Sequence, residues 1–313
     1  MIYIKDLKDG DYVNDQFVVT SVNKSVTTKG SEYYRLGLKD ATGNVNAVKW
    51  TISLGDEEIV APGAIIFVSG VVETYGKNAN IQIRIDAIKP VSSEDVITAK
   101  FLKMPPVKKE ILIERFNAHI NSIQDDDLKL LVNTIVKKYE DKLFIYPAAV
   151  SVHHDFSSGL LYHTVSMADI ASFLAGYYPN VNRDLLITGT ILHDMAKTIE
   201  FEGDITFKYS LEGKLLGHIT MGMAIIRETA KELGLEGEKI LLLEHMVLSH
   251  HGELEFGSPV LPQTREAILL NLIDNLDSKM AVVEKALEDV KPGEMSQKVF
   301  ALDNRILYKG KDE

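Results

Sequence analysis

The stretch "ILHDMAK" at residues 191–197 places His193 and Asp194 side by side inside a strongly apolar segment. Such a pair either packs as a buried, hydrogen-bonded unit or binds a metal ion. Other apolar segments carry similar groups, namely His163, His218, His250, His251 and Asp274. Packing alone explains so many groups poorly, because each buried polar group without a partner costs about 1–3 kcal/mol. Imidazoles suit Mn, Fe, Co, Ni or Zn, and an aspartate can bridge two cations, so the sequence predicts a metal site.

These residues require a helical scaffold. From Val107 onward the apolar residues recur with a helical period, and helices are expected at roughly 160–177, 184–197, 214–233, 237–250 and 264–288. Residues 107–313 are therefore predicted to form an all-helical domain. Residues 91–106, which end at Pro105-Pro106, are predicted to be a linker.

Residues 1–90 read differently. They contain five short stretches rich in β-branched and aromatic residues: "QFVVTSVNKSV", "EYYRLGLKD", "NVNAVKW", "AIIFVSGVVETY" and "ANIQIRIDAIK". Five such strands predict a small closed barrel of the OB-fold type, with an SH3-like barrel as the alternative. The predicted fold class is thus a two-domain α+β protein, with an N-terminal barrel and a C-terminal all-α domain.

Strand alternation predicts which barrel side chains face outward. Tyr34, Leu36 and Leu38 share the inner face, which leaves Tyr33 and Arg35 outside. An aromatic among cations on the outer face is the arrangement that stacks bases of a single strand, although a solvated sheet face is an equal alternative. Lys49 and Arg84 are also expected outside, and Trp50 is expected in the core.

Composition limits the class of protein. The net charge is −11, and residues 1–90 hold 10 Lys and Arg against 11 Asp and Glu, so most of the negative charge lies in the helical part. This balance argues against a protein that coats nucleic acid through bulk positive charge. With no Cys, no signal segment and no long apolar run, a cytoplasmic protein without membrane attachment is expected.

The series His163…His193-Asp194…Asp274 resembles the signature of the HD superfamily of metal-dependent phosphohydrolases. The additional His218 and His250-His251 resemble its two-metal members, and "GLLYHT", "LSHHGELEFGSP" and "EAILLNLIDNLDSK" strengthen the likeness. An OB-type barrel ahead of such a domain is similar to the YhaM family of bacterial 3′-5′ exoribonucleases.

This resemblance implies the ligands of two divalent metal ions, with Mn expected first and Fe, Co, Ni or Zn as alternatives. One ion would be held by His163, His193, Asp194 and Asp274. The second would be held by Asp194, His218, His250 and His251, with Asp194 as the bridge. The chemistry implied is attack by a hydroxide held between two metals.

Lys197 follows Asp194 by three residues. It is expected to hold the scissile phosphate beside the catalytic Asp194, unless it is a solvated lysine at a helix end. His154, with its neighbour His153, would contact substrate or form a surface doublet. His119 and His245 are expected to be structural, and Asp277 is expected to orient a ligand.

Three functions remain open from the sequence. The first is a hydrolase and exonuclease that releases 5′-mononucleotides from single-stranded RNA, with single-stranded DNA left open. The second is a phosphodiesterase acting on small or cyclic nucleotides, although the "IPDxIL" word of the HD-GYP branch is absent after "HDMAK". The third is a non-catalytic, metal-containing RNA-binding protein. A homo-oligomer is also left open.

Overall fold

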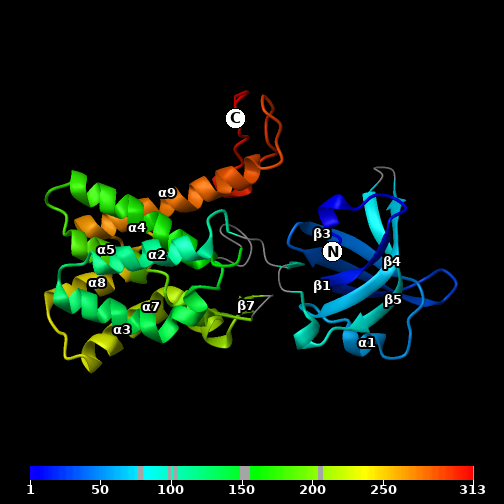
Figure 1. The fold of residues 1–313 in the computed structure, drawn as a ribbon, viewed down its shortest axis with the longest axis horizontal. Helices are drawn as coiled ribbons and strands as arrows, with labels where there is room; N and C mark the ends of the chain where they lie inside the picture. Colours follow the sequence, from blue (N-terminus) through cyan, green and yellow to red (C-terminus); the bar gives the residue numbers. More distant parts are fainter. Residues whose placement is uncertain (77–79, 98–99, 102–104, 149–155, 204–206, 313) are drawn as a thin grey trace. The chain divides into compact units, whose positions relative to one another are not determined.

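The computed structural model divides the chain into two compact units, a β-barrel unit and a helical unit (Figure 1). It describes residues 1–76, 80–97, 100–101, 105–148, 156–203 and 207–312. The first unit covers Met1–Met104, and the second covers Pro105–Glu202 and Phe207–Glu313. None of the helices in the described ranges is long and apolar enough to cross a membrane.

The first unit is a closed barrel in the strand order β1-β2-β3-β5-β4. Its strands are β1 (Tyr12–Val26), β2 (Glu32–Asp40), β3 (Gly43–Lys49), β4 (Ile65–Tyr75) and β5 (Asn80–Pro90). The pairing is antiparallel except between β3 and β5, where Ala47 lies opposite Ile83 in parallel register. The short helix α1 (Asp56–Ile59) precedes β4. This five-stranded barrel is an OB-fold, which confirms the prediction.

Alternation along the strands builds the barrel core. In β4 every second residue from Ile66 to Val72 is buried, and Phe17 of β1 and Leu38 of β2 are also buried in the barrel core. Gly70 takes one inward position at a register shift against β5, where a Cβ atom would lie 2.2 Å from the Arg84 carbonyl oxygen. Only glycine allows the two strands to approach this closely.

Two of the predicted barrel orientations are wrong, because the inward side of β3 is Val45, Ala47 and Lys49. Lys49 is only 3% exposed, and its Nζ lies 3.4 Å from Asp56 Oδ2, so a buried ion pair allows a lysine on the inner side. Trp50 lies just after the end of β3 and is 48% exposed instead of buried in the core. Tyr33 has the predicted outward parity, but it is only 7% exposed because Trp50 covers it with a ring-centroid separation of 4.7 Å.

The described part of the segment after β5, which the sequence predicts as a linker over residues 91–106, packs onto the barrel. The Gln16 side chain donates to the Asp95 carbonyl and accepts from the Ile97 amide. Lys100 is fully buried, with its Nζ 2.8 Å from Asp15 Oδ2 and 4.2 Å from the centre of the Phe17 ring. These contacts extend the barrel unit to Met104.

The second unit is helical, as predicted. Its helices are α2 (Lys109–Asn121), α3 (Asp126–Leu143), α4 (Gly159–Tyr177), α5 (Arg183–Leu192), α6 (Lys197–Glu200), α7 (Leu211–Glu232), α8 (Glu238–Ser249) and α9 (Arg265–Leu287). Its continuous apolar core includes Leu131, Leu161, Ile187 and Leu270. The short strands β6 (Phe201–Glu202) and β7 (Lys208–Tyr209) pair antiparallel between α6 and α7.

Two interruptions of the helices lie directly before candidate metal ligands, His193 and His218. The helix predicted over 184–197 ends at Leu192, and residues 193–196 form turns before α6 begins. Within α7, Gly217 has φ 70° and ψ 152°, which interrupts the helix directly before His218. A left-handed φ of this kind is readily adopted only by glycine.

Candidate metal centre

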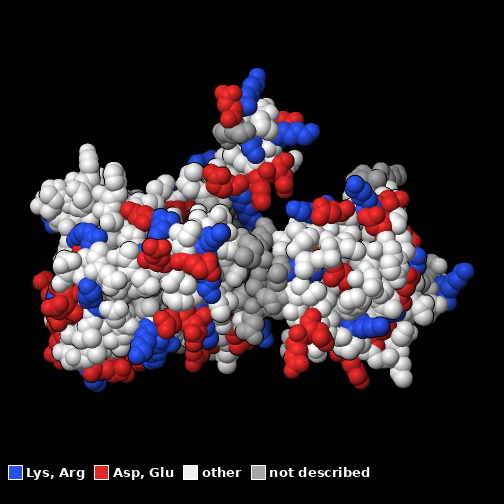
Figure 2. All heavy atoms as spheres, viewed as in Figure 1, with Lys and Arg blue, Asp and Glu red and all other residues white. Residues whose placement is uncertain are grey.

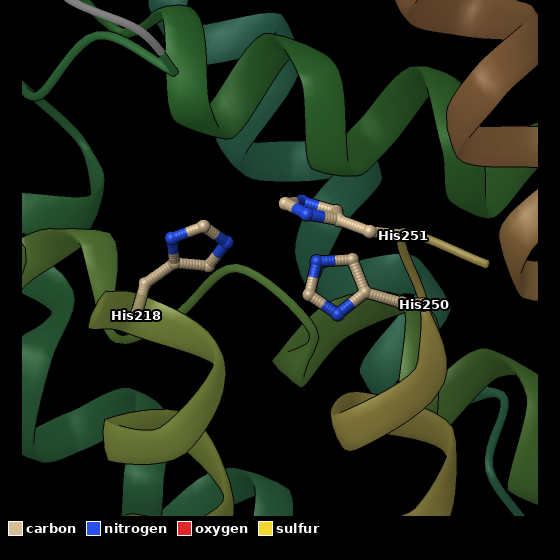
Figure 3. A group of neighbouring side chains, drawn as sticks. All are labelled: His218, His250 and His251. Carbon is tan, nitrogen blue, oxygen red and sulfur yellow. The ribbon is translucent and has the colours of Figure 1, made fainter. Parts of the chain in front are cut away.

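Helices α4, α5, α7, α8 and α9 bring two groups of three side chains together. His163 of α4, His193 after α5 and Asp274 of α9 form the first group. His218 of α7 and His250-His251 after α8 form the second group, and Figure 3 shows His218 facing the histidine doublet. Within each group, one ligand atom per residue lies within 4.8 Å of the others. Both groups therefore have the size of a metal site.

The Asp194 carboxylate connects the two groups. Its Oδ2 atom lies 3.3 Å from His193 Nε2 and 3.7 Å from His163 Nε2. Its Oδ1 atom lies 3.4 Å from His218 Nε2 and 3.8 Å from His250 Nε2. Each oxygen thus serves a different group, which is the geometry required of a bridging ligand.

The backbone fixes the orientation of the two histidines that follow helix ends. His193 Nδ1 lies 2.7 Å from the Thr190 carbonyl oxygen, and His250 Nδ1 lies 2.6 Å from the Val247 carbonyl oxygen. Carbonyls near a helix C-terminus lack helical donors, and a ring N–H can supply one. Because a carbonyl only accepts, Nδ1 must carry the proton and Nε2 keeps its lone pair.

Carboxylates orient the other two buried imidazoles in the same way. His163 Nδ1 lies 2.7 Å from Asp277 Oδ2, as the sequence predicted for an orienting role of Asp277. His218 Nδ1 lies 3.0 Å from Glu200 Oε1, which also accepts from the His218 backbone amide. Such partners direct Nε2 toward a metal and raise the basicity of the imidazole.

The donor set fits divalent metal ions. Four buried ligand atoms have no hydrogen-bond partner among the described residues: His193 Nε2, Asp194 Oδ1, His218 Nε2 and His250 Nε2. All four point into the space between the two groups, as the distances to Asp194 require. Buried polar atoms are normally paired, so a converging set of lone pairs without donors indicates cations.

The electrostatics of the cluster follow from the same contacts. Burial opposes the charged form of His163, but hydrogen bonds to Asp274 and Asp277 outweigh it and raise the pKa of His163 to about 9. Burial, reinforced by the charges of His251 and His193, holds the pKa of His250 well below its usual value. His250 is therefore a neutral imidazole near neutral pH, whereas His163 carries a proton that a bound cation would have to replace.

Lys197 lies inside the centre and is not a solvated helix-end lysine. Its Nζ lies 2.7 Å from Asp194 Oδ2, and the side chain is buried. Burial lowers the pKa of Lys197, but the neighbouring Asp194 carboxylate outweighs it and raises that pKa. Burial likewise raises the pKa of Asp194, but Lys197 and His193 hold it well below its usual range. Lys197 is thus a fixed cation beside the proposed bridge.

A cavity of about 460 Å³ opens beside the cluster, and it is large enough for a small ligand. Asp194, Lys197, His218, His251 and Asp274 are among the residues that line it. The lining also includes residues of α6, β6, β7, α9 and the C-terminal segment, among them Glu200, Phe201, Tyr209, Asn275, Lys279 and Ala301.

The remaining candidate histidines divide into two classes. His153 and His154 lie outside the described residues. His119 Nε2 bonds to Asp169 Oδ1, and His245 Nε2 accepts from the Gln263 amide, so both have the structural contacts that the sequence predicted.

The sequence analysis does not identify Glu200 as the partner that orients His218, although Glu200 follows Lys197 by only three residues.

On the barrel, a groove of about 280 Å³ is lined by residues of all five strands. Arg35 and Trp50 line it, with Asn46, Tyr75 and Gln82. The Arg35 guanidinium lies 5.6 Å from the centre of the Tyr33 ring, and Trp50 covers that ring. The exposed aromatic surface beside Arg35 is therefore Trp50, not Tyr33.

Comparison with known proteins agrees with this geometry. Residues 160–279 match the HD domain family. The helical unit therefore contains an HD domain, the class of domain to which this fold and this His/Asp cluster point, and an HD domain implies a divalent metal.

The particular family follows from full-length relatives. The chain is 42% identical to the 3′-5′ exoribonuclease YhaM of Geobacillus sp. (strain WCH70), over 96% of this chain and 92% of that protein. It is 39% identical to the 3′-5′ exoribonuclease YhaM of Bacillus subtilis (strain 168), over 96% and 95% of the two chains. The chain therefore belongs to the YhaM family of 3′-5′ exoribonucleases, as the sequence resemblance indicated.

Solved structures similar to part of the chain include the second OB-fold domain of replication protein A from Methanococcus maripaludis. The identity is 25%, with 29% of this chain and 95% of that chain covered and a TM-score of 0.24. The second single-stranded DNA binding protein from Mycobacterium smegmatis is 18% identical, with 32% and 100% covered and a TM-score of 0.24.

Proposed function

We propose that the chain is a metal-dependent hydrolase that removes 5′-mononucleotides from the 3′ end of single-stranded RNA, with two divalent metal ions bound in the HD domain. The observation that carries this proposal is the position of Asp194, with one oxygen toward each group of imidazoles. Family membership supports the reaction, since the full-length relatives are named 3′-5′ exoribonucleases.

The proposed ligands divide as the two groups do. His163, His193 and Asp274 hold one cation, and His218, His250 and His251 hold the other. Asp194 belongs to both. A set of imidazoles and carboxylates without thiolates suits Mn²⁺ first, with Fe, Co, Ni or Zn as alternatives. Bound there, two such ions would supply an activated water and positive charge opposite the phosphate.

The chain's own residues position the phosphate. Lys197 Nζ is held beside Asp194 and lines the cavity, so it can donate to a non-bridging phosphate oxygen. Glu200 accepts from the His218 backbone amide and bonds the Nδ1 atom of its ring, so it restricts rotation of the ring when substrate enters. The buried walls of the cluster limit water to the open cavity side.

The barrel is proposed to hold the strand. Bulk charge does not favour this binding, because residues 1–90 hold 10 Lys and Arg against 11 Asp and Glu. Figure 2 shows both signs interspersed on one face. The groove with Arg35 and Trp50 instead offers stacking and local positive charge, the combination that binds single strands without reading their sequence. Single-stranded DNA has the same two features and is a second candidate strand.

One assay tests this function. Single-stranded RNA labelled at its 5′ end is incubated with the metal-loaded protein, and the products are separated with time. A ladder that shortens from the 3′ end, with 5′-mononucleotides as the released product, is expected. Intact RNA together with hydrolysis of a cyclic dinucleotide would replace the proposal with the small-nucleotide phosphodiesterase.

A second assay tests the barrel in the full-length protein. Trp50→Ala combined with Arg35→Ala is expected to raise KM for RNA about fivefold or more, with hydrolysis of a nitrophenyl ester of a nucleotide unchanged. Trp50→Phe is the matched control that keeps a stacking ring. Unchanged KM in the double variant would contradict a role of the groove in RNA binding.

A further inference from the structure

The cavity beside the candidate metal ligands is also lined by groups that metal binding does not use. Asn275 and Lys279 of α9 and Tyr209 of β7 all line it. Lys279 follows Asp274 by five residues, which corresponds to about 7.5 Å along the helix axis. No acidic side chain among the described residues pairs with Lys279 in the structure, so its charge remains available to an anion at the cavity wall.

The Tyr209 ring is a fixed platform rather than a mobile surface side chain. β7 pairs with β6 so that Tyr209 lies opposite Phe201, and the two rings meet edge to face with centroids 5.1 Å apart. The next residue, Ser210, anchors the chain through its amide to the Glu200 carbonyl and through its hydroxyl to the Ile199 carbonyl. Phe201 is buried, whereas Tyr209 is 45% exposed. A rigid aromatic ring half-exposed in a cavity offers a face to a planar ligand.

The direction of the strand decides which phosphate Lys279 can meet. In an RNA with a free 3′-hydroxyl, the scissile phosphate is the last phosphate of the chain. Any second phosphate in the cavity must therefore lie one nucleotide toward the 5′ end. Metal ligands surround the first position, and Lys279 is a cation that lines the same cavity outside the ligand groups.

We propose that Tyr209 and Lys279 form a nucleotide-positioning subsite within the HD domain. Tyr209 stacks on a base at the 3′ end of the strand, and Lys279 neutralises the phosphate on the 5′ side of the penultimate nucleotide. The subsite rests on the proposed exonuclease function. It also defines the smallest substrate that would contact both the candidate metal centre and the subsite. That substrate is a dinucleotide with a 5′-phosphate.

Two dinucleotides test the role of Lys279, one with a 5′-phosphate and one with a 5′-hydroxyl. The wild-type protein is expected to hydrolyse the phosphorylated dinucleotide with a KM about two- to fivefold lower, and this preference should shrink as salt increases. Lys279→Gln should abolish the preference, and Lys279→Arg should keep it. Lys208→Gln is the matched control, because Lys208 is highly exposed, pairs with Glu202 and does not line the cavity.

Tyr209 is tested by the separation of KM from kcat. Tyr209→Ala should raise KM for both dinucleotides about fivefold or more with little change in kcat, and Tyr209→Phe should restore the wild-type KM. The metal content of each variant should equal that of the wild type. Equal KM values for the two dinucleotides in the wild-type protein, or a preference that survives Lys279→Gln, would overturn the subsite.

Equilibrium binding of the same dinucleotides to the metal-free protein separates the two proposals. The preference for the 5′-phosphate should persist without metal, because Lys279 is not a ligand. If binding shows this preference but neither dinucleotide is hydrolysed after metal loading, the exonuclease function fails and the subsite stands. If hydrolysis occurs without any preference in binding or KM, the subsite fails and the function stands.

Discussion

The two halves of the metal centre are built alike in their outer contacts. In the half with His163 and His193, one imidazole is oriented by a carboxylate and the other by a backbone carbonyl. The half with His218 and His250 repeats this pair of contacts. The pairs His193-Asp194 and His250-His251 both follow the end of a helix. In each pair, Nδ1 of the first histidine bonds the backbone carbonyl three residues earlier.

The halves differ in charge and in access. Asp274 completes the first half, whereas the neutral imidazole of His251 completes the second. A cation bound in the first half would therefore meet two carboxylates, Asp274 and Asp194, whereas a cation bound in the second half would meet only Asp194. Both His218 and His251 line the cavity, whereas His163 and His193 do not. More negative charge and less exposure should make the first half the tighter and slower-exchanging site.

The largest expected effect comes from removing the residue that both halves share. Asp194→Ala should reduce metal content in both halves and lower kcat by more than about a hundredfold, since even residues that only orient ligands cost about 10–100-fold. Elemental analysis and RNA hydrolysis measure the two effects. Asp141→Ala, on the exposed side of α3, is the control. Two metals per chain in the Asp194 variant would contradict the bridge.

Removing a ligand from one half should separate the two sites. His251→Ala is expected to leave about one metal per chain, because the first half keeps all of its ligands. His193→Ala should weaken the more strongly charged half, and dialysis against graded chelator concentrations compares the two variants. Loss of both metals from the His251 variant would mean that the halves fill cooperatively.

The carboxylates that orient the imidazoles should have smaller, half-specific effects. Asp277→Asn should lower the affinity of the first half about 10–100-fold, and Glu200→Gln should do the same for the second half. Competition with a metal-sensitive dye gives both affinities. If each variant weakened both halves equally, the division between the halves would be wrong.

The smallest expected effect is the release of one proton from His163 when a metal binds to the first half. The pKa of His163 is about 9 without metal, so below that pH a metal entering the first half must displace a proton. Its affinity should therefore rise about tenfold per pH unit up to about pH 9. His250 has a lowered pKa and is already neutral at pH 7, so it releases none. Calorimetric titration in two buffers of different ionisation enthalpy should give about one proton for the first half, and zero would contradict this assignment.

The structure brings together the side chains that the sequence predicts as metal ligands, whereas the barrel surface differs from its prediction, and the difference has a physical reason. His163 and Asp274 lie in helices and His193 directly follows one, all within apolar stretches where a polar group is conspicuous. Glu200 and Tyr209 gave no such signal. Glu200 ends the four-residue helix α6 and Tyr209 belongs to the two-residue strand β7, both after His193-Asp194 in the chain, and elements this short have no recognisable period.

The barrel errors come from the end of a single strand. In "NVNAVKW" the apolar Val48 and Trp50 suggested the inner face, yet the inner positions belong to Ala47 and Lys49. The ion pair with Asp56, a residue outside the strand, makes the buried lysine tolerable. The alternation of side chains along a strand cannot predict an ion-pair partner such as Asp56, which lies outside the strand. It also cannot predict that Trp50 covers Tyr33.

The bridging role of Asp194 is tested most directly by the electron paramagnetic resonance spectrum of the fully Mn²⁺-loaded protein. Two Mn²⁺ ions joined by one carboxylate should give the spectrum of an exchange-coupled pair, at two metals per chain. Asp194→Asn should remove the coupling and leave isolated Mn²⁺ signals. A wild-type spectrum of isolated ions, or one metal per chain at saturation, would contradict the bridged two-metal centre.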